Sequence, residues 1–474
     1  MTTGQAMMLL WVGMLTLLMF FACSPKGPAV DSAEPRPPES VAWNGGLGTT
    51  TADVGQIRQW LPRRSIMHLH SPWSHDACDG EPLIDGQPDP DCLQDLRDAL
   101  CTTAVDIAYL SDHPAHAADQ PFEDLFHASP DDERIEVDGK LIATRITCED
   151  GHTVLWRAGI EDELMPLGLE AHAVTGDPEE SHRLYNEATA EAIAAESAAG
   201  ALVSIAHTEG KTLEDLSDYV AMGLEAVELF NLHAMFDPSK RSEDLGLDPL
   251  GWASDIAPFT RPDGTGEPDL FFLGVFEEQT VSIERWDALQ DIDSVVGFAG
   301  TDAHQNVLPF DLRDGERGDS YRRMLRWFSN HVLVDAGETE PSPQSADAAI
   351  AAGRVYAAFE ILGTPTGLDF HLKDEDGSIT EMGGTGEGTE LVVNCPTLSD
   401  ASPTNTTPPE ITATIFKNGS PWNTGCGTHT IDGPGSYRVR VDITPYHLTD
   451  FLGETPDEWL HSYPWVYTNP IRVL

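Results

Sequence analysis

The stretch that decides the fold is residues 66–80, Ile-Met-His-Leu-His-Ser-Pro-Trp-Ser-His-Asp-Ala-Cys-Asp-Gly. Its first residues are apolar and typical of a buried strand, in which residues two apart point to the same side, so His68 and His70 can face one cation. The Ser- and Pro-containing residues that follow break the strand, and the loop then carries His75 and Asp76. Two hydrogen-bonded histidines in a half-buried sheet would explain this stretch equally well. The rest of the chain has to decide.

Further apolar runs also end in residues that can bind metals. The runs at 104–110, 154–158, 201–206 and 294–300 precede, in that order, His113, Glu161, His207, and Asp302 with His304, and a shorter strand predicted around residues 170–175 carries His172. Ligands at the C-terminal ends of successive strands are the arrangement of a β/α-barrel active site. We therefore expect these side chains to meet at one end of a barrel.

The order of these motifs resembles a known family. His-X-His, Asp-His, Gly-X-Glu, His, Ala-His and Gly-Thr-Asp-Ala-His follow one another as in the PHP (polymerase and histidinol phosphatase) superfamily of metal-dependent phosphoesterases, over roughly residues 60–335. Thr208 departs from the pattern, because the family usually has Pro after this histidine. The resemblance implies an α/β fold, a distorted (β/α)7 PHP barrel at residues 61–340.

The same resemblance implies a cluster of two or three divalent metals, and it distributes the ligands among three positions. The first metal would take His68, His70, Glu161 and Asp302; the second Glu161, His172 and His207; the third His75 or Asp76 with His113 and His304. The choice between His75 and Asp76 stays open. Imidazole and carboxylate ligands without thiolate suit zinc, manganese or iron.

Such a cluster predicts the chemistry. Two cations about 3.5–4 Å apart generate hydroxide from a bound water and stabilise charge on a phosphoryl oxygen, so the metal-bound hydroxide attacks and no catalytic side chain is required. We expect a hydrolase of small phosphate esters. The alternatives are a PHP-type carbamate or amide hydrolase, and a non-catalytic surface binding module that keeps its metals for structure.

Residues around the ligands have weaker signals. Arg322 and Arg323 are candidates for binding an anionic substrate, because guanidinium groups suit phosphate; the alternative is the solvated face of an amphipathic helix at residues 320–330. Asp112 could orient a ligand ring or cap a strand end. Glu228 and Asn231 fit the end of a plain strand better than a role behind the ligands, and the interpretation of His233 is structural.

Composition limits the partners. The chain has 79 acidic and 27 basic residues, a formal net charge of −52. Such a field repels nucleic acid and concentrates divalent cations, so we expect a small phosphoester or other anionic substrate and no long nucleic acid. No protein partner can be inferred.

The N-terminus predicts export and a lipid anchor. An apolar run at residues 7–22 fits the core of a signal peptide, and Phe-Phe-Ala-Cys at 20–23 resembles a bacterial lipobox in which Cys23 is lipidated. An uncleaved anchor and a misassigned start are the alternatives. We expect a signal peptide at 1–23, a disordered linker at 24–60, and attachment to the membrane of a bacterial cell envelope, periplasmic or surface-exposed.

The other six cysteines fit an oxidising compartment. We expect disulfides joining Cys395 to Cys426 and Cys78 to Cys92, although Cys78 could in principle bind metal instead. Alternating apolar runs separated by Gly and Pro after residue 340 predict a small C-terminal β-sandwich at 341–474.

Overall fold

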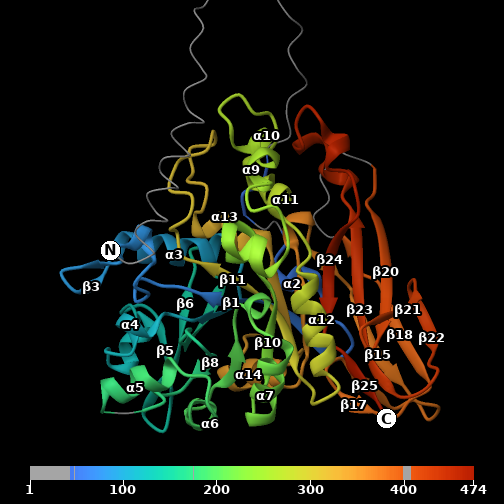
Figure 1. Ribbon diagram of the computed structural model, residues 1–474, viewed down its shortest axis with the longest axis horizontal. Helices are drawn as coiled ribbons and strands as arrows, with labels where there is room; N and C mark the ends of the chain where they lie inside the picture. The colour runs from blue at the N-terminus through green and yellow to red at the C-terminus, as the bar shows by residue number, and fades with distance from the viewer. Residues whose placement is uncertain (1–42, 47–48, 175, 399–406) are drawn as a thin grey trace, which may run out of the picture. The chain divides into compact units, whose positions relative to one another are not determined.

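The fold is built around one closed ring of strands. A computed structural model describes residues 43–46, 49–174, 176–398 and 407–474 (Figure 1). The predicted signal peptide, Cys23 and residues 24–42 of the predicted linker lie outside the described residues. The ring contains seven strands: β1 (Trp60–Leu69), β4 (Ile107–Leu110), β7 (Thr153–Gly159), β8 (Met165–Leu169), β9 (Leu202–Ile205), β10 (Ala226–Asn231) and β11 (Val296–Ala303).

Six of these strands run in one direction and one runs against them. The pairs β1–β4, β4–β7, β9–β10, β10–β11 and β11–β1 are parallel, whereas β8 is antiparallel to both β7 and β9. The strands are buried along almost their whole length, which is why they read as continuous apolar runs. The C-terminal ends of all strands except β8 therefore lie at one end of the barrel.

The predicted (β/α)7 barrel is wrong. The structure is a closed seven-stranded β-barrel with further strands outside it, and only 29% of the chain is helical. No helix separates β7 from β8, and between β4 and β7 the chain adds a hairpin of β5 (Glu133–Val137) and β6 (Lys140–Thr147). Apolar runs predicted the strands, but they carry no information on strand direction or on what connects one strand to the next.

Helices cover parts of the barrel. The longer ones are α3 (Pro90–Thr102), α5 (Pro178–Tyr185), α6 (Ala190–Ala198), α7 (Leu213–Met222), α12 (Thr280–Leu289), α13 (Tyr321–Trp327) and α14 (Pro343–Ala351). The others have four residues each: α2 (Thr51–Val54), α4 (Pro114–Ala117), α8 (His233–Phe236), α9 (Trp252–Asp255), α10 (Ala257–Thr260) and α11 (Phe272–Val275). Helix α7 begins after Thr212, whose hydroxyl accepts from Asp215 N, and ends at Gly223 with a φ of 113°.

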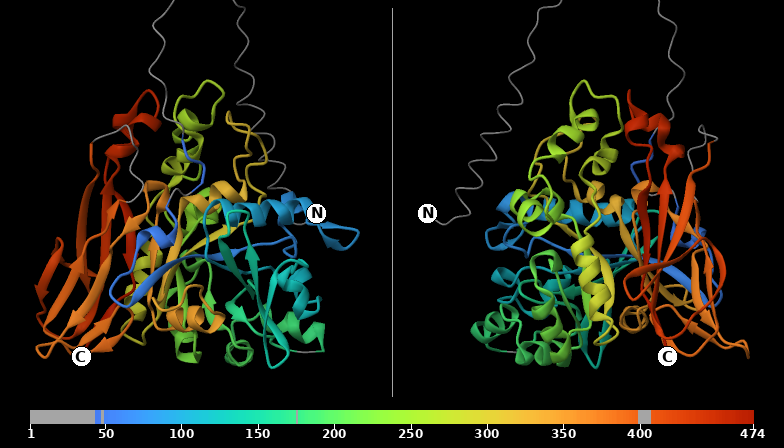
Figure 2. Two further views of the ribbon diagram at one scale, coloured as in Figure 1. Left: turned by 180° about the vertical axis from the view of Figure 1, so that it is seen from behind. Right: turned by 45° about the vertical axis from the view of Figure 1, so that its right-hand side comes forward.

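Strands outside the ring extend the barrel sheet into the part of the chain where the C-terminal β-sandwich was predicted. The strands β12 (Ser329–Asp335), β13 (Val355–Ala358), β17 (Thr385–Gly386), β20 (Glu410–Lys417), β21 (Ser420–Thr424), β23 (Gly435–Thr444), β24 (Tyr463–Thr468) and β25 (Ile471–Val473) continue the barrel sheet. The link runs from β1 to β12, β13 and β24, all antiparallel. Figure 2 shows these orange and red strands beside the barrel in both views.

The remaining strands form three smaller sheets. One contains β16 (Ile379–Glu381), β15 (Asp369–Lys373), β18 (Glu390–Asn394) and β22 (Gly427–Thr430), and two pairs are formed by β14 (Pro365–Thr366) with β19 (Thr397–Leu398) and by β2 (Leu83–Ile84) with β3 (Gln87–Pro88).

Buried polar side chains connect the barrel to the C-terminal strands. The Asn469 amide accepts from Gly297 N at 2.7 Å and donates to Gly297 O and Val355 O at 2.8 Å each. Arg64 of β1 donates to both carboxylate oxygens of Glu360, at 2.8 and 2.7 Å, and both side chains are fully buried. A buried charge is tolerated because its partner is held in place.

Three disulfides are formed, Cys78–Cys92, Cys101–Cys148 and Cys395–Cys426. The two predicted pairings are confirmed. The bonds are consistent with an oxidising compartment outside the cytosol. Within the described parts of the chain, no helix combines the length and apolar character needed to cross a membrane.

Candidate metal centre

The ends of five of the parallel strands bring the predicted ligands together. His68 lies at the end of β1 with His70 directly after the strand, and Asp302 lies near the end of β11, just before His304. The loops after β4, β7 and β9 supply His113, Glu161 and His207. Among the described residues the side chains form three overlapping groups whose ligand atoms lie within 4.8 Å of one another: His70, Asp76, His113 and His304; His68, Glu161 and His207; His68, His70 and Asp302.

All five histidines of these groups have Nδ1 within hydrogen-bond distance of an oxygen atom. The acceptors are Glu228 Oε1 for His68 (2.5 Å), Ser74 Oγ for His70 (3.0 Å), Glu161 O for His113 (2.8 Å), Glu209 Oε1 for His207 (3.2 Å) and Asp302 O for His304 (2.8 Å). Ser74 accepts because its own hydroxyl donates to Asp76 Oδ1 at 2.9 Å. A neutral ring that donates through Nδ1 has its lone pair on Nε2.

The five Nε2 atoms then face carboxylates. His68 and His70 approach Asp302 Oδ1 at 3.2 and 3.3 Å, and His207 approaches Asp302 Oδ2 at 3.4 Å and Glu161 Oε1 at 3.6 Å. His113 and His304 approach Asp76 Oδ2 at 3.5 and 3.3 Å.

Three of these Nε2 atoms, those of His68, His70 and His304, are buried without a hydrogen-bond partner. Buried polar atoms are normally satisfied, and the combination of convergent imidazole lone pairs with carboxylate oxygens is a donor set for divalent transition metals. The residues present therefore fit a metal centre.

Further polar groups hold the ligands from behind. Glu228 of β10 accepts from His68 through Oε1 and from His207 N through Oε2, at 2.9 Å. The Asn231 amide nitrogen donates to Glu228 Oε2 at 3.0 Å and to Asp302 Oδ2 at 3.2 Å. Position 300 must be glycine, since a Cβ there would collide with Glu228 Oε1. The interpretation of Glu228 as a plain strand residue missed its hydrogen bond with His68, because no local sequence pattern indicates that β10 lies near β1.

The backbone is strained where the ligands lie. His68, His207 and Asp302 have φ of 64°, 53° and 47°, the left-handed region that side chains other than Gly rarely adopt. Each such residue costs about 1–3 kcal/mol and persists where the surroundings impose it, most often at functional sites. Three strained residues in one cluster point to a functional role for this end of the barrel.

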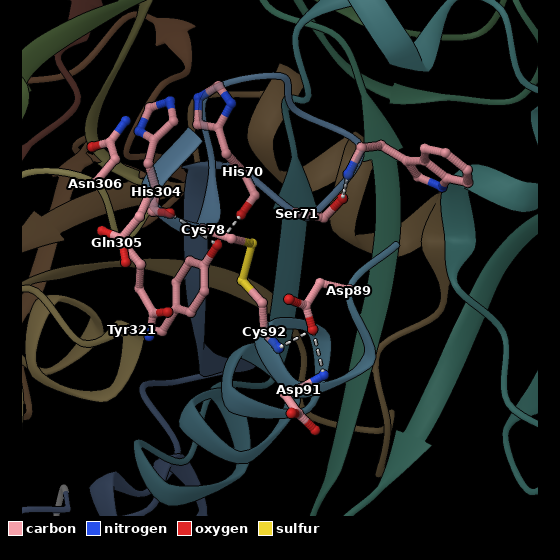
Figure 3. The surroundings of a disulfide bond; sticks show 12 residues. His70, Ser71, Cys78, Asp89, Asp91, Cys92, His304, Gln305, Asn306 and Tyr321 are labelled. Atoms are coloured by element: carbon pink, nitrogen blue, oxygen red, sulfur yellow. Dashed lines mark hydrogen bonds between the residues drawn. A yellow bond between two sulfur atoms is a disulfide. The ribbon is translucent and has the colours of Figure 1, made fainter. Parts of the chain in front are cut away.

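The loop after β1 brings Asp76 to the cluster and leaves His75 at the surface. His75 is exposed and belongs to none of the three groups, whereas Asp76 joins His70, His113 and His304. Figure 3 shows the Cys78–Cys92 disulfide beside His70 and His304, whose ring centroids are 3.7 Å apart. Cys78 N also donates to His304 O at 2.9 Å, so the loop is fixed against the last ligand, and the disulfide leaves no thiolate for a metal.

A second main-chain hydrogen bond lies next to the one from Cys78 N to His304 O. Asp79 N donates to Gln305 O, also at 2.9 Å. Tyr321 adds a third tie to this side of the cluster, because its hydroxyl donates to His70 O at 2.9 Å (Figure 3). The loop and the segment after β11 are therefore held together by main-chain bonds, and the disulfide joins the same loop to α3.

His172 does not reach the cluster. It lies three residues beyond the end of β8, the one antiparallel strand, so it does not follow a strand end that meets those of the other ligands. Its Nε2 donates to Gln120 O at 2.9 Å, and no metal-capable group of the described residues includes it. The prediction treated every strand as parallel, and local sequence has no signal for the reversal.

Arg322 and Arg323 are held by carboxylates instead of facing the histidines. Arg322 donates to both oxygens of Asp269, at 2.9 and 2.7 Å, and Arg323 pairs with Asp269 and with Asp314. Trp43 Nε1 donates to the same Asp269 at 2.6 Å. This arginine cluster joins α13 to the segment before α11 and to residue 43, the first described residue.

Asp112 supports the loop and does not orient a ligand ring. Its carboxylate accepts from Ser71 N at 2.6 Å and from Ser71 Oγ at 2.7 Å. Burial raises the pKa of Asp112 to about 7, although the bonds from Ser71 oppose this shift.

The pKa values of the histidines follow their neighbours. Burial, together with the adjacent His304, lowers the pKa of His70 to about 3. Burial would also lower the pKa of His113 and His207, but contacts with Asp76 and Glu161 raise the first to about 11, and contacts with Glu209 and Asp302 raise the second to about 9. Without a cation these carboxylates attract protons, so metal binding would release protons.

One further histidine lies at the cluster. His233, which the sequence interpretation took as structural, begins α8 and places Nδ1 3.6 Å from Asp302 Oδ2. Its position two residues past the end of β10 was a signal of the kind that identified the other ligands.

The chain was compared with protein-family models, curated proteins and solved structures. No protein-family model matches the chain, and no curated protein or solved structure matches it either.

Proposed function

We propose that this protein is a metal-dependent hydrolase of small phosphate esters, as the resemblance to the PHP superfamily implies. The observation that supports it best is that each of five histidines has Nδ1 within hydrogen-bond distance of an oxygen and Nε2 facing Asp302, Glu161 or Asp76. An ordinary buried polar network would use both ring nitrogens in hydrogen bonds.

The residues of the three groups would hold the cations. Asp302, which faces His68, His70 and His207, and Glu161, which faces His207, would each lie beside more than one metal position. Bound cations would activate a water and stabilise negative charge on a phosphoryl oxygen. The two serines in the adjacent loop, Ser71 and Ser74, already donate to Asp112 and Asp76, so neither hydroxyl is free to act as a nucleophile.

Exposure determines the side from which a substrate can approach. The His68 and His70 side chains are fully buried, whereas those of His113, His207 and Asp76 are 21%, 26% and 34% exposed. A substrate would reach the cluster past these three residues. The net charge of −52 favours a small substrate over a long nucleic acid.

The proposed location is the envelope of a bacterial cell, with the chain anchored by a lipid on Cys23. Its support is the lipobox-like sequence at residues 20–23 together with the three disulfides. Labelling with a radioactive fatty acid tests the anchor: incorporation into the wild type and none into Cys23→Ser is expected, and equal labelling of both contradicts it.

Elemental analysis of the purified protein followed by a substrate panel tests the function. We expect two or three equivalents of zinc, manganese or iron, and hydrolysis of a phosphomonoester or phosphodiester that is lost in His70→Ala. His75→Ala is the matched control, because His75 lies in the same loop outside the three groups. A folded protein without metal contradicts the proposal. Hydrolysis of carbamates or amides alone would favour the related hydrolase, and a metal-loaded protein inert to all three would favour a binding module.

A further inference from the structure

The ligand group of His68, Glu161 and His207 has one histidine, His207, that occurs in no other group, whereas the group of His70, Asp76, His113 and His304 has two. The resemblance gives the position of Glu161 and His207 a second histidine, His172, but His172 follows the antiparallel strand β8 and belongs to none of the three groups. Another imidazole would complete the set that the resemblance implies.

His172 is also engaged elsewhere. Its Nε2 donates to Gln120 O at 2.9 Å, and its Nδ1 lies 3.4 Å from the Tyr185 hydroxyl, which in turn accepts from Ala173 N at 2.9 Å. Bringing this ring to Glu161 would require breaking these bonds.

His233 occupies the place where topology would put such a ligand. It follows β10, and β10 lies between β9 and β11 with all three strands parallel, so His233 emerges between the ends that carry His207 and Asp302. Its ring centroid is 6.1 Å from that of His207, and its Nδ1 is 3.6 Å from Asp302 Oδ2, the same oxygen that His207 Nε2 approaches at 3.4 Å.

The start of α8 is fixed to the cluster. Asn231 Oδ1 accepts from Ala234 N at 3.1 Å, while the amide nitrogen of the same side chain donates to Glu228 and Asp302. The His233 side chain itself is 45% exposed, so its ring has room to turn. The backbone is thus held in place while the imidazole can adjust to a cation.

We propose that His233, and not His172, is the second histidine ligand of the metal position formed by Glu161 and His207. The proposal rests on the proposed metal centre. It places the ligand at the end of a parallel strand, as for every other ligand of the cluster, and makes this position depend on α8 instead of on the segment after β8.

Metal stoichiometry of paired variants tests this inference. The wild type, His233→Ala and His172→Ala are purified identically, dialysed against metal-free buffer and analysed for bound metal, with circular dichroism as the folding control. We expect His233→Ala to lose about one equivalent and His172→Ala to keep the wild-type content. His233→Gln, which retains a polar side chain without an imidazole, should behave as His233→Ala does.

The outcomes separate the two proposals. Wild-type protein without metal would overturn the metal centre, and with it this inference. A metal-loaded wild type whose His233 variants keep every equivalent, or whose His172→Ala variant loses one, would overturn the role of His233 alone.

Discussion

Two charge-rich clusters of this molecule use their charges differently. In the arginine cluster the guanidinium groups of Arg322 and Arg323 meet the buried carboxylate of Asp269, so each positive group faces a negative one. In the metal-capable cluster imidazole lone pairs and carboxylate oxygens converge instead, and three Nε2 atoms are buried without a hydrogen-bond partner. The first arrangement is complete as a structural joint, whereas the second would gain stability from a cation, as we propose.

The largest effect is expected at the shared carboxylate of the metal-capable cluster. Asp302→Asn replaces a charged ligand that faces His68, His70 and His207. We expect loss of bound metal and a fall of phosphoesterase activity to the uncatalysed rate, measured by elemental analysis and a phosphoester assay. An active Asp302→Asn variant with full metal content would contradict the view that the imidazoles and carboxylates of this cluster converge on a cation.

The equivalent change in the arginine cluster should affect stability instead. Asp269→Asn removes the buried carboxylate that pairs with both Arg322 and Arg323 and leaves them, among the described residues, only Asp314 and Glu316 as acidic partners, so we expect a loss of up to about 3–5 kcal/mol. Denaturant unfolding should show this loss in the free energy of unfolding, while metal content per folded chain stays unchanged. The control is Asp255→Asn, since the exposed Asp255 should change stability by no more than about 0.5 kcal/mol.

A smaller effect is expected behind the ligands. Glu228→Gln weakens the hydrogen bond that orients His68, and loss of such a partner lowers metal affinity about 10–100-fold. Competition with a chelator measures the affinity. The exposed Glu225, just before the same strand, is the control, and equal affinities of Glu228→Gln and Glu225→Gln would contradict the role of Glu228.

A pH-dependent effect is expected at a carboxylate that lies near neither a counter-charge nor an imidazole. Glu196 on α6 is fully buried with both oxygens unpaired, and burial raises its pKa from 4.5 to about 9. Between these values the folded state binds more protons than the unfolded state. The free energy of unfolding should therefore fall as pH rises through this window, by at most about 1.4 kcal/mol per pH unit.

Urea unfolding between pH 5 and pH 8.5 measures that slope. Glu196→Gln should lack this contribution and be more stable than the wild type at the upper end, whereas Glu191→Gln, at an exposed position of the same helix, should keep the wild-type slope. Identical slopes for the wild type and Glu196→Gln would mean that Glu196 is ionised in the folded protein.

Most of the candidate site could be predicted because its signals are local. An apolar run followed by His, Asp or Glu identifies a strand end, and His68, His113, Glu161, His207 and Asp302 each carry that signal on their own strand. Two disulfides could be predicted for a similar reason, since their cysteines lie 14 and 31 residues apart. Contacts between distant segments could not, and Arg322 with its partner Asp269, 53 residues away, is an example.

The sequence by itself determined which side chains can bind metals, the strands that most of them follow, and the strongly acidic character of the chain. Tertiary structure alone decided the reversed direction of β8, the closure of the barrel, and the pairing of β13 with β24 across more than a hundred residues. As a result, His172 lies outside the cluster, whereas Asp76 and His233 lie at it. The physical reason is that strand direction depends on hydrogen bonds to neighbouring strands, which a local pattern of apolar residues does not specify.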